Sequence, residues 1–132
     1  MLVLTVWLDA WQMQCCGEQF SVGSRVTWTL SESIDRDFAT TVLGDELAST
    51  VTHAEDHHGG LPDGAPTTSG FVRSIRAASC VYAAASPETK TRYPVSGSLS
   101  LVEKASATGW EPEEAERKFV AYLVQLDDQA GG

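Results

Sequence analysis

The stretch F-S-V-G-S-R-V-T-W-T-L, residues 20–30, carries the clearest secondary-structure signal in the chain. Val26, Trp28 and Leu30 alternate with polar residues, and this is the period of a β-strand that buries one face. Gly23, followed by serine, predicts a tight turn before that strand. The stretch therefore favours a β-rich fold.

Three other segments extend the β pattern. Residues 2–8 are rich in valine and leucine and predict a first strand, while residues 70–82 and 98–105 predict a long strand and a shorter one. The segment 113–126 fits helical spacing and also fits a strand buried on both faces. Of these alternatives we choose a strand that begins at Lys118.

Two segments allow a helix. Ser33 can cap a short helix over residues 35–43, and Gly44 is a natural stop for it. Residues 47–53 suit a strand, although a helix over residues 45–57 is an alternative because no glycine or proline interrupts it. We therefore expect one or two short helices.

The chain is expected to form one domain. Its 132 residues are enough for a core without disulfides or metal, and residues 59–70, rich in glycine and proline, predict an exposed loop. We predict a domain over residues 1–126 and a disordered tail over residues 127–132. The fold expected is mainly β (or α+β): a small SH3-like or bent-sheet barrel of about six strands.

The acidic composition excludes some partners. Lysine and arginine total 9 against 18 aspartates and glutamates, and the net charge of -9 opposes nucleic acid and anionic membranes. No sequence window approaches the ~20 apolar residues of a membrane helix. Three cysteines do not make a secreted disulfide framework, so we expect a cytoplasmic protein. No pattern indicates an oligomeric state.

The cysteines and histidines form the sharpest chemical set. They are Cys15, Cys16, His53, His57, His58 and Cys80. Zinc prefers thiolate and neutral imidazole ligands, but adjacent cysteines project apart, so at most one of that pair would bind a given ion. The alternative function is therefore a zinc metalloprotein, hydrolytic or redox, with these ligands: Cys16, His57, His58 and Cys80. The plainer interpretation of residues 11–17 is a packed strand end that turns at Gly17.

The candidate binding residues lie elsewhere. Most of the four tryptophans are expected in the core, with Trp110 the exposed exception because it lies in a loop. Arg73 and Arg76 lie in a region with few acids. We expect these three residues and the loop 59–70 to engage a protein or small molecule. Catalysis is less expected, since no hydrolase or nucleotide-binding motif occurs. A further alternative is an acidic inhibitor or immunity-type protein that docks on a basic target through residues 32–56.

Two motifs resemble known families. V-G-x-x-V at residues 22–26 with G-x-V-x-x-I at residues 70–75 resembles the opening strands of SH3-like barrels, which are mostly binding modules. W-Q-M-Q-C-C-G-x-x-F-x-V-G-x-x-V-x-W at residues 11–28, with H-H-G at residues 57–59, resembles a family of small uncharacterised proteins of high-GC bacteria. That family is a domain of unknown function. The resemblance implies a self-contained domain and supplies no activity.

Overall fold

The computed structural model describes residues 2–15, 18–55, 67–84, 86–114 and 116–128. Within these ranges the chain is mainly β, with three short helices. The elements are, in chain order, β1 (Leu2–Asp9), α1 (Ala10–Cys15), β2 (Phe20–Ser21), β3 (Arg25–Trp28), β4 (Leu30–Ser31), α2 (Arg36–Leu43), α3 (Asp45–Ala48), β5 (His53–Glu55), β6 (Thr68–Ala84), β7 (Arg92–Pro94), β8 (Ser100–Lys104), β9 (Ser106–Ala107) and β10 (Arg117–Asp128). The predicted fold class, a mainly β chain that forms a small barrel, is confirmed, and the likeness to SH3-like barrels stays a prediction.

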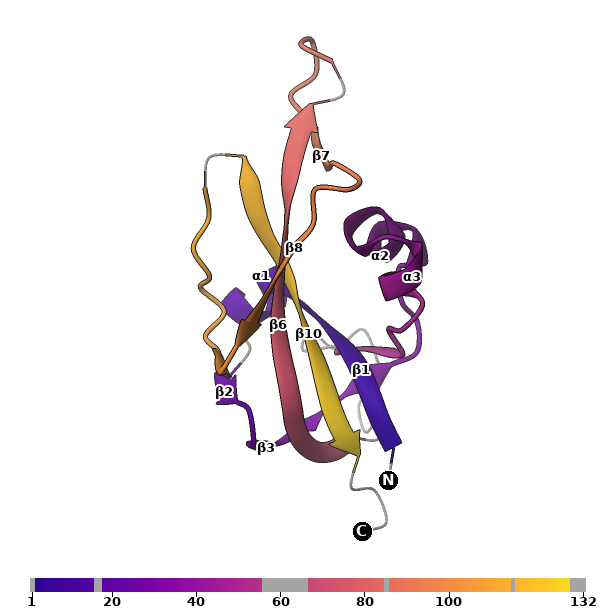
Figure 1. Cartoon of the computed structure of the whole chain (residues 1–132), viewed down its shortest axis with the longest axis vertical. Coiled ribbons are helices and arrows are strands. Elements are labelled where there is room, and N and C mark those ends of the chain that lie inside the picture. The colour runs from indigo at the N-terminus through magenta and orange to yellow at the C-terminus, as the bar shows by residue number, and fades with distance from the viewer. Residues whose placement is uncertain (1, 16–17, 56–66, 85, 115, 129–132) are drawn as a thin grey trace.

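The main sheet curls into a nearly closed barrel (Figure 1). Among the described residues its strand order is β3-β6-β10-β1-β5-β4, and β7 and β8 pair with β6 beside this path. The pairing of β1 with β5 is parallel, and the other pairings are antiparallel. Since β6 pairs with β10 on one edge and with β3, β8 and β7 in turn on the other, this long strand holds the barrel together.

The opening stretch folds back as predicted. Gly23 adopts a φ of 91°, which a glycine tolerates and which lets the chain turn into β3. The rings of Phe20 and Trp28 then meet edge to face, with centroids 5.1 Å apart. Trp28 is buried, whereas Val26 and Leu30 are partly buried and pack against the same core. The alternation in the sequence therefore reports real one-sided burial, but the strand breaks at Thr29: β3 ends at Trp28 and pairs with β6, and Leu30 begins β4, which pairs with β5.

The last strand is buried on both faces, which confirms the choice of strand over helix. β10 lies between β6 and β1, and its residues from Phe119 to Val124 are all buried. A register irregularity between Phe119 and Ala121 turns both Val120 and Ala121 toward the same core. This irregularity also explains why the hydrophobic pattern fits helical spacing. β10 continues through Asp127 and Asp128, so it ends two residues later than predicted.

Two cores pack against opposite faces of the sheet. The first lies inside the barrel and includes Val6, Met13, Phe20, Trp28, Ile75, Ala77, Phe119, Tyr122 and Val124. The second lies between the outer face of the sheet and the helices α2 and α3, which cover that face in Figure 1. It includes Trp7, Ala39, Val42, Ala48, Cys80, Ala121 and Leu123.

The helix predicted over residues 35–43 is present as α2, but its cap is different. Asp35, not Ser33, caps it, because the Oδ1 atom of Asp35 accepts a hydrogen bond of 3.0 Å from the N–H of Phe38. Gly44 ends the helix with a φ of 86°. The ambiguous segment that follows matches neither candidate in full: the helix α3 ends at Ala48, and the strand β5 begins only at His53.

Two further boundaries correct the sequence analysis. Residues 10–15 form helix α1 rather than a strand end, and this helix leaves the indole of Trp11 55 % exposed. The loop predicted over residues 59–70 ends earlier, since β6 begins at Thr68. The rest of that loop lies outside the described residues.

Candidate functional site

The strongest candidate site is a turn held from below by a buried hydroxyl. Tyr122 projects from β10 into the barrel and is 0 % exposed. The N–H of Gly109 donates to the Oη of Tyr122 over 3.0 Å, and that hydroxyl donates to the Oε2 of Glu111 over 2.5 Å. One hydroxyl therefore fixes both neighbours of Trp110.

Lys104 completes this polar network from β8. Its Nζ lies 2.9 Å from the Oε1 of Glu111, a carboxylate whose side chain is only 9 % exposed. Burial and the hydrogen bond to Glu111 raise the pKa of Tyr122 from its usual 10.0 to about 12, although the N–H of Gly109 acts in the opposite direction. The hydroxyl thus keeps its proton at neutral pH and can donate to Glu111.

Two more hydrogen bonds fix the turn, which comprises residues 108–111 and is here named the Trp110 turn. The side-chain amide of Gln14 on α1 donates to the carbonyl oxygen of Gly109 over 3.0 Å. The N–H of Trp110 donates to the hydroxyl of Thr108 over 3.2 Å. The indole of Trp110 is nevertheless 68 % exposed, as predicted from its loop position. A rigid base therefore presents an exposed aromatic ring.

A groove of about 370 Å³ lies beside this turn. Ala77, Val102 and Phe119 give it apolar walls, and Lys104, Glu111 and Arg117 add charged groups. The Nη1 atom of Arg117 donates to the carbonyl oxygens of Ser98 and Ser79 over 2.8 Å and 3.4 Å. Lys104, Glu111 and Arg117 are therefore already engaged in holding the surrounding elements.

The two arginines of the predicted binding set lie away from the Trp110 turn. The Nε of Arg73 lies 3.5 Å from the Oδ2 of Asp127, near the end of β10. Arg76 alternates along β6 with Ile75 and Ala77, whose side chains belong to the barrel interior, so Arg76 points to the outer face. The structure does not gather the three residues into one site. Ligand binding by the two arginines stays a prediction.

The predicted zinc site also stays a prediction, since Cys16, His57 and His58 lie outside the described residues. Cys80 is a free thiol in the second core, and burial raises its pKa although the charge of Arg117 lowers it. Cys15 is exposed at the end of α1 and is disulfide-bonded, so it does not share an ion with Cys80. Among the described residues, no three acids, cysteines or histidines lie close enough to hold a metal.

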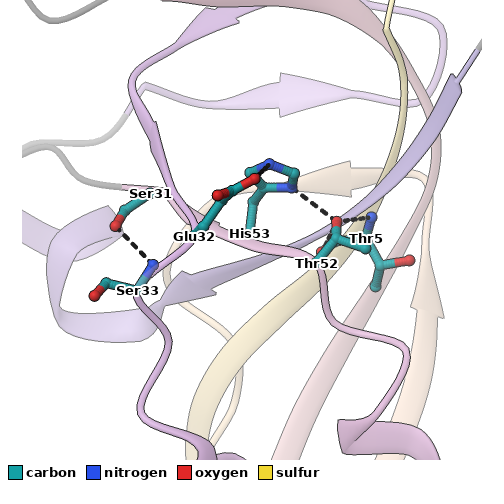
Figure 2. Close-up of polar contacts among 6 residues, drawn as sticks. All are labelled: Thr5, Ser31, Glu32, Ser33, Thr52 and His53. Carbon is teal, nitrogen blue, oxygen red and sulfur yellow. Dashed lines mark hydrogen bonds and ion pairs between the residues drawn. The ribbon is translucent and has the colours of Figure 1, made fainter.

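His53 belongs to a polar network on β5 (Figure 2). Its Nδ1 lies 2.9 Å from the hydroxyl of Thr52, and its Nε2 lies 3.9 Å from the Oε1 of Glu32. The order of acid, imidazole and hydroxyl resembles a nucleophilic triad. The hydrogen bonds of Thr52 show a different role.

The hydroxyl of Thr52 binds the backbone of β1. It accepts from the N–H of Thr5 over 3.0 Å and donates to the carbonyl oxygen of the same residue over 3.1 Å. The hydroxyl has one proton, so the direction of its bond to His53 depends on the tautomer of the ring, while the backbone of Thr5 engages the hydroxyl both as donor and as acceptor. The side chain of Glu32 is 88 % exposed, so it does not orient the imidazole ring of His53 in a site that excludes water. The network fastens β5 to β1.

In the acidic segment 32–56, the acids on and before the short helices are exposed, whereas Glu55 is buried and residue 56 lies outside the described residues. Asp45 and Glu46 occupy the first turn of α3, where carboxylates favour the helix N-terminus. The guanidinium of Arg36 donates to the carbonyl oxygen of Ala48 over 3.1 Å, so it ties α2 to α3. These contacts explain the local structure of the segment. Docking on a basic target stays a prediction.

The comparisons with known proteins place the chain in a family. A family model matches residues 2–128, from the start of β1 to the end of β10. The chain belongs to the family of unknown function DUF6578. This agrees with the resemblance to a domain of unknown function. No match to this DUF6578 protein was found among the curated proteins or among the solved structures. In the described part of the chain, each helix is too short to cross a lipid bilayer.

Sequence reasoning found Trp110 and missed its support. Tyr122 lies within an apolar run and Glu111 within a polar loop, and no local pattern links them. Only the position of β10 in the barrel wall, which points the side chain of Tyr122 inward, brings the hydroxyl under the turn.

Proposed function

We propose that this DUF6578 protein is a small binding module that docks a partner protein through Trp110. The observation that carries the proposal is the exposed indole on a turn fixed by the buried hydroxyl of Tyr122. Tryptophan is the residue type most enriched at interface hot spots, since it offers a large apolar face and a polar N–H. A ring on a rigid base also loses little conformational entropy when it is buried by a partner.

The network beneath the turn supports this role. A lysine, a carboxylate and a phenol occupy positions where apolar side chains could pack. All three hold residues 109–111 in place. A buried polar network fixes one geometry because each member must find its partner. The residue that this network holds in place, Trp110, is exposed. An exposed ring in a fixed position suits recognition of a partner better than stability alone. The cytoplasmic location expected from the cysteine count is part of the proposal, although the disulfide of Cys15 is a feature more common outside the reducing cytosol.

A comparison of variants tests it. The immobilised protein is exposed to a lysate of its own source cells, and bound proteins are quantified by mass spectrometry for wild type, Trp110→Ala and Tyr93→Ala. Tyr93 is the matched control, an aromatic residue on β7 that is 56 % exposed. We expect at least one bound protein to be lost with Trp110→Ala and kept with Tyr93→Ala.

The affinity of that protein, purified and measured by calorimetry, should fall about 30-fold or more with Trp110→Ala, as for a hot spot of about 2 kcal/mol. Tyr122→Phe, which keeps the indole and loosens its base, should weaken binding by a smaller factor. Equal capture by wild type and Trp110→Ala of every bound protein would refute the proposal.

A further inference from the structure

A second cavity, of about 420 Å³, lies next to the groove, and Phe119 lines both. It is formed where the end of β1 and α1 meet α2, the end of β6 and the start of β10. Four aromatic rings and two carboxylates line it, and the name aromatic cleft is used here for that set: Asp9, Trp11, Phe38, Tyr82, Glu113 and Phe119. No lysine, arginine or histidine is among the described residues that line the cleft.

The negative charge of this cleft is held in place by neutral donors. The Oδ1 of Asp9 accepts from the indole N–H of Trp7 over 2.8 Å, and its Oδ2 accepts from the side-chain amide of Gln12 over 3.2 Å. The Oε2 of Glu113 accepts from the N–H of Phe119 over 2.8 Å. Within the described residues neither carboxylate forms a salt bridge. Two oriented negative charges therefore face the cleft, and within the described part of the chain no cation neutralises them.

The aromatic rings favour the same class of ligand. Phe38 and Tyr82 are partly buried, so their rings are held by the second core while one part of each remains accessible. The ring of Trp7 meets that of Phe38 edge to face, with centroids 6.0 Å apart, and this contact restrains Phe38. Trp11 is 55 % exposed at the rim. Aromatic faces carry negative electrostatic potential, and they attract a cation most strongly where a carboxylate adds its charge.

We infer that the aromatic cleft is a site for the cationic side chain, arginine or lysine, of a partner protein. A carboxylate or phosphate ligand would meet two like charges, and a purely apolar one would leave both carboxylates to be desolvated without compensation. The net charge of -9 also steers basic partners toward this protein. The inference goes beyond the proposed function and does not depend on Trp110, which does not line the cleft.

Titration with small probes tests the inference directly. The probes are Nα-acetyl-arginine amide, Nα-acetyl-lysine amide and the neutral isostere Nα-acetyl-citrulline amide, added at constant ionic strength to ¹⁵N-labelled protein and followed by NMR. We expect at least one cationic probe to shift the amide signals of residues 9–14 and 113 with a Kd of roughly millimolar, a value typical of one isolated side chain. The citrulline probe should bind at least about tenfold more weakly.

Variants assign the effect to the cleft. Glu113→Gln removes a charge and keeps an oxygen for the N–H of Phe119, whereas Asp9→Asn removes a charge and keeps an acceptor for only one of its two donors, Trp7 and Gln12. Each should weaken binding about threefold or more. Trp11→Leu should also weaken it, and as an exposed residue on α1 it is not expected to unfold the protein. The matched control is Glu88→Gln, an exposed carboxylate in the turn before β7. It should bind like wild type, as should Trp110→Ala.

Two results would overturn the inference. One is equal binding of the citrulline and cationic probes, or no shift with any probe. The other is unchanged affinity in both Glu113→Gln and Asp9→Asn, once circular dichroism shows that they are folded. The two proposals are tested separately, because Trp110→Ala changes only the proposed docking residue. If the probes do not bind the aromatic cleft, the capture experiment still tests docking through Trp110. If Trp110→Ala captures the same proteins as wild type, the probe titration still tests the cleft.

Discussion

Removing one oxygen atom tests the support of the Trp110 turn. In Tyr122→Phe the ring keeps its contact with Phe119, where the two centroids lie 4.8 Å apart, and only the hydroxyl is lost. The buried N–H of Gly109 then has no acceptor, and Glu111 loses one donor but keeps Lys104. An unsatisfied buried N–H costs about 1–3 kcal/mol, and a hydrogen bond to a charged group contributes about 1.5–3 kcal/mol. We expect the free energy of unfolding to fall by about 2.5–6 kcal/mol, the sum of these two contributions.

Urea unfolding at pH 7, followed by far-UV circular dichroism, measures this loss. The matched control is Tyr93→Phe, which removes the hydroxyl of a tyrosine that is 56 % exposed and should change the free energy by less than about 0.5 kcal/mol. If Tyr122→Phe were as stable as this control, the hydroxyl would not support the turn.

The pH dependence gives a second, independent readout of the same hydroxyl. The folded protein raises the pKa of Tyr122 from 10.0 to about 12, so its neutral form stabilises the fold. That contribution is complete below pH 10 and is lost as the pH rises through 12, with a size of roughly 3 kcal/mol for a shift of about two units. The difference between wild type and Tyr122→Phe should therefore narrow between pH 10 and pH 12. A constant difference across that window would contradict the assignment of the proton to the bond with Glu111.

Three further predictions concern the stability of the fold and the alternative zinc site. Thr52→Val removes the acceptor of the buried N–H of Thr5 and should cost about 1–3 kcal/mol in urea unfolding; an unchanged midpoint would contradict its role on β1. Gly70→Ala should cost about 3 kcal/mol or more, because its Cβ would lie 2.3 Å from the carbonyl oxygen of Asp127, whereas Gly44→Ala meets no atom within 4 Å and should cost only the positive-φ strain of about 1–2 kcal/mol. The binding-module proposal predicts no stoichiometric zinc in untagged protein by elemental analysis. One zinc per chain would favour the alternative ligands Cys16, His57, His58 and Cys80.

Hydrophobic periodicity predicted the strands well where one face of a strand is buried. The alternation of Val26, Trp28 and Leu30 is local, so it can be recognised without knowing what covers the strand. It was ambiguous for β10, because a strand covered on both faces has no polar side and its irregularity at Val120 shifts the period. The N-cap of α2 was predicted at Ser33 instead of Asp35, because the local sequence allowed more than one interpretation here too. Ser33 and Asp35 both suit a cap, and the hydrogen bond to Phe38 decides between them.

The sequence by itself determined the acidic charge, the β-rich fold class and the exposure of Trp110, since these depend on composition and on local patterns. Tertiary structure alone decided that Tyr122 supports the Trp110 turn and that Asp9 and Glu113 face one aromatic cleft. Those residues come from separate elements, and their approach depends on strand register and on the bend of the sheet. Register is fixed by burial of whole strand faces, which is a property of the folded chain and not of any one segment.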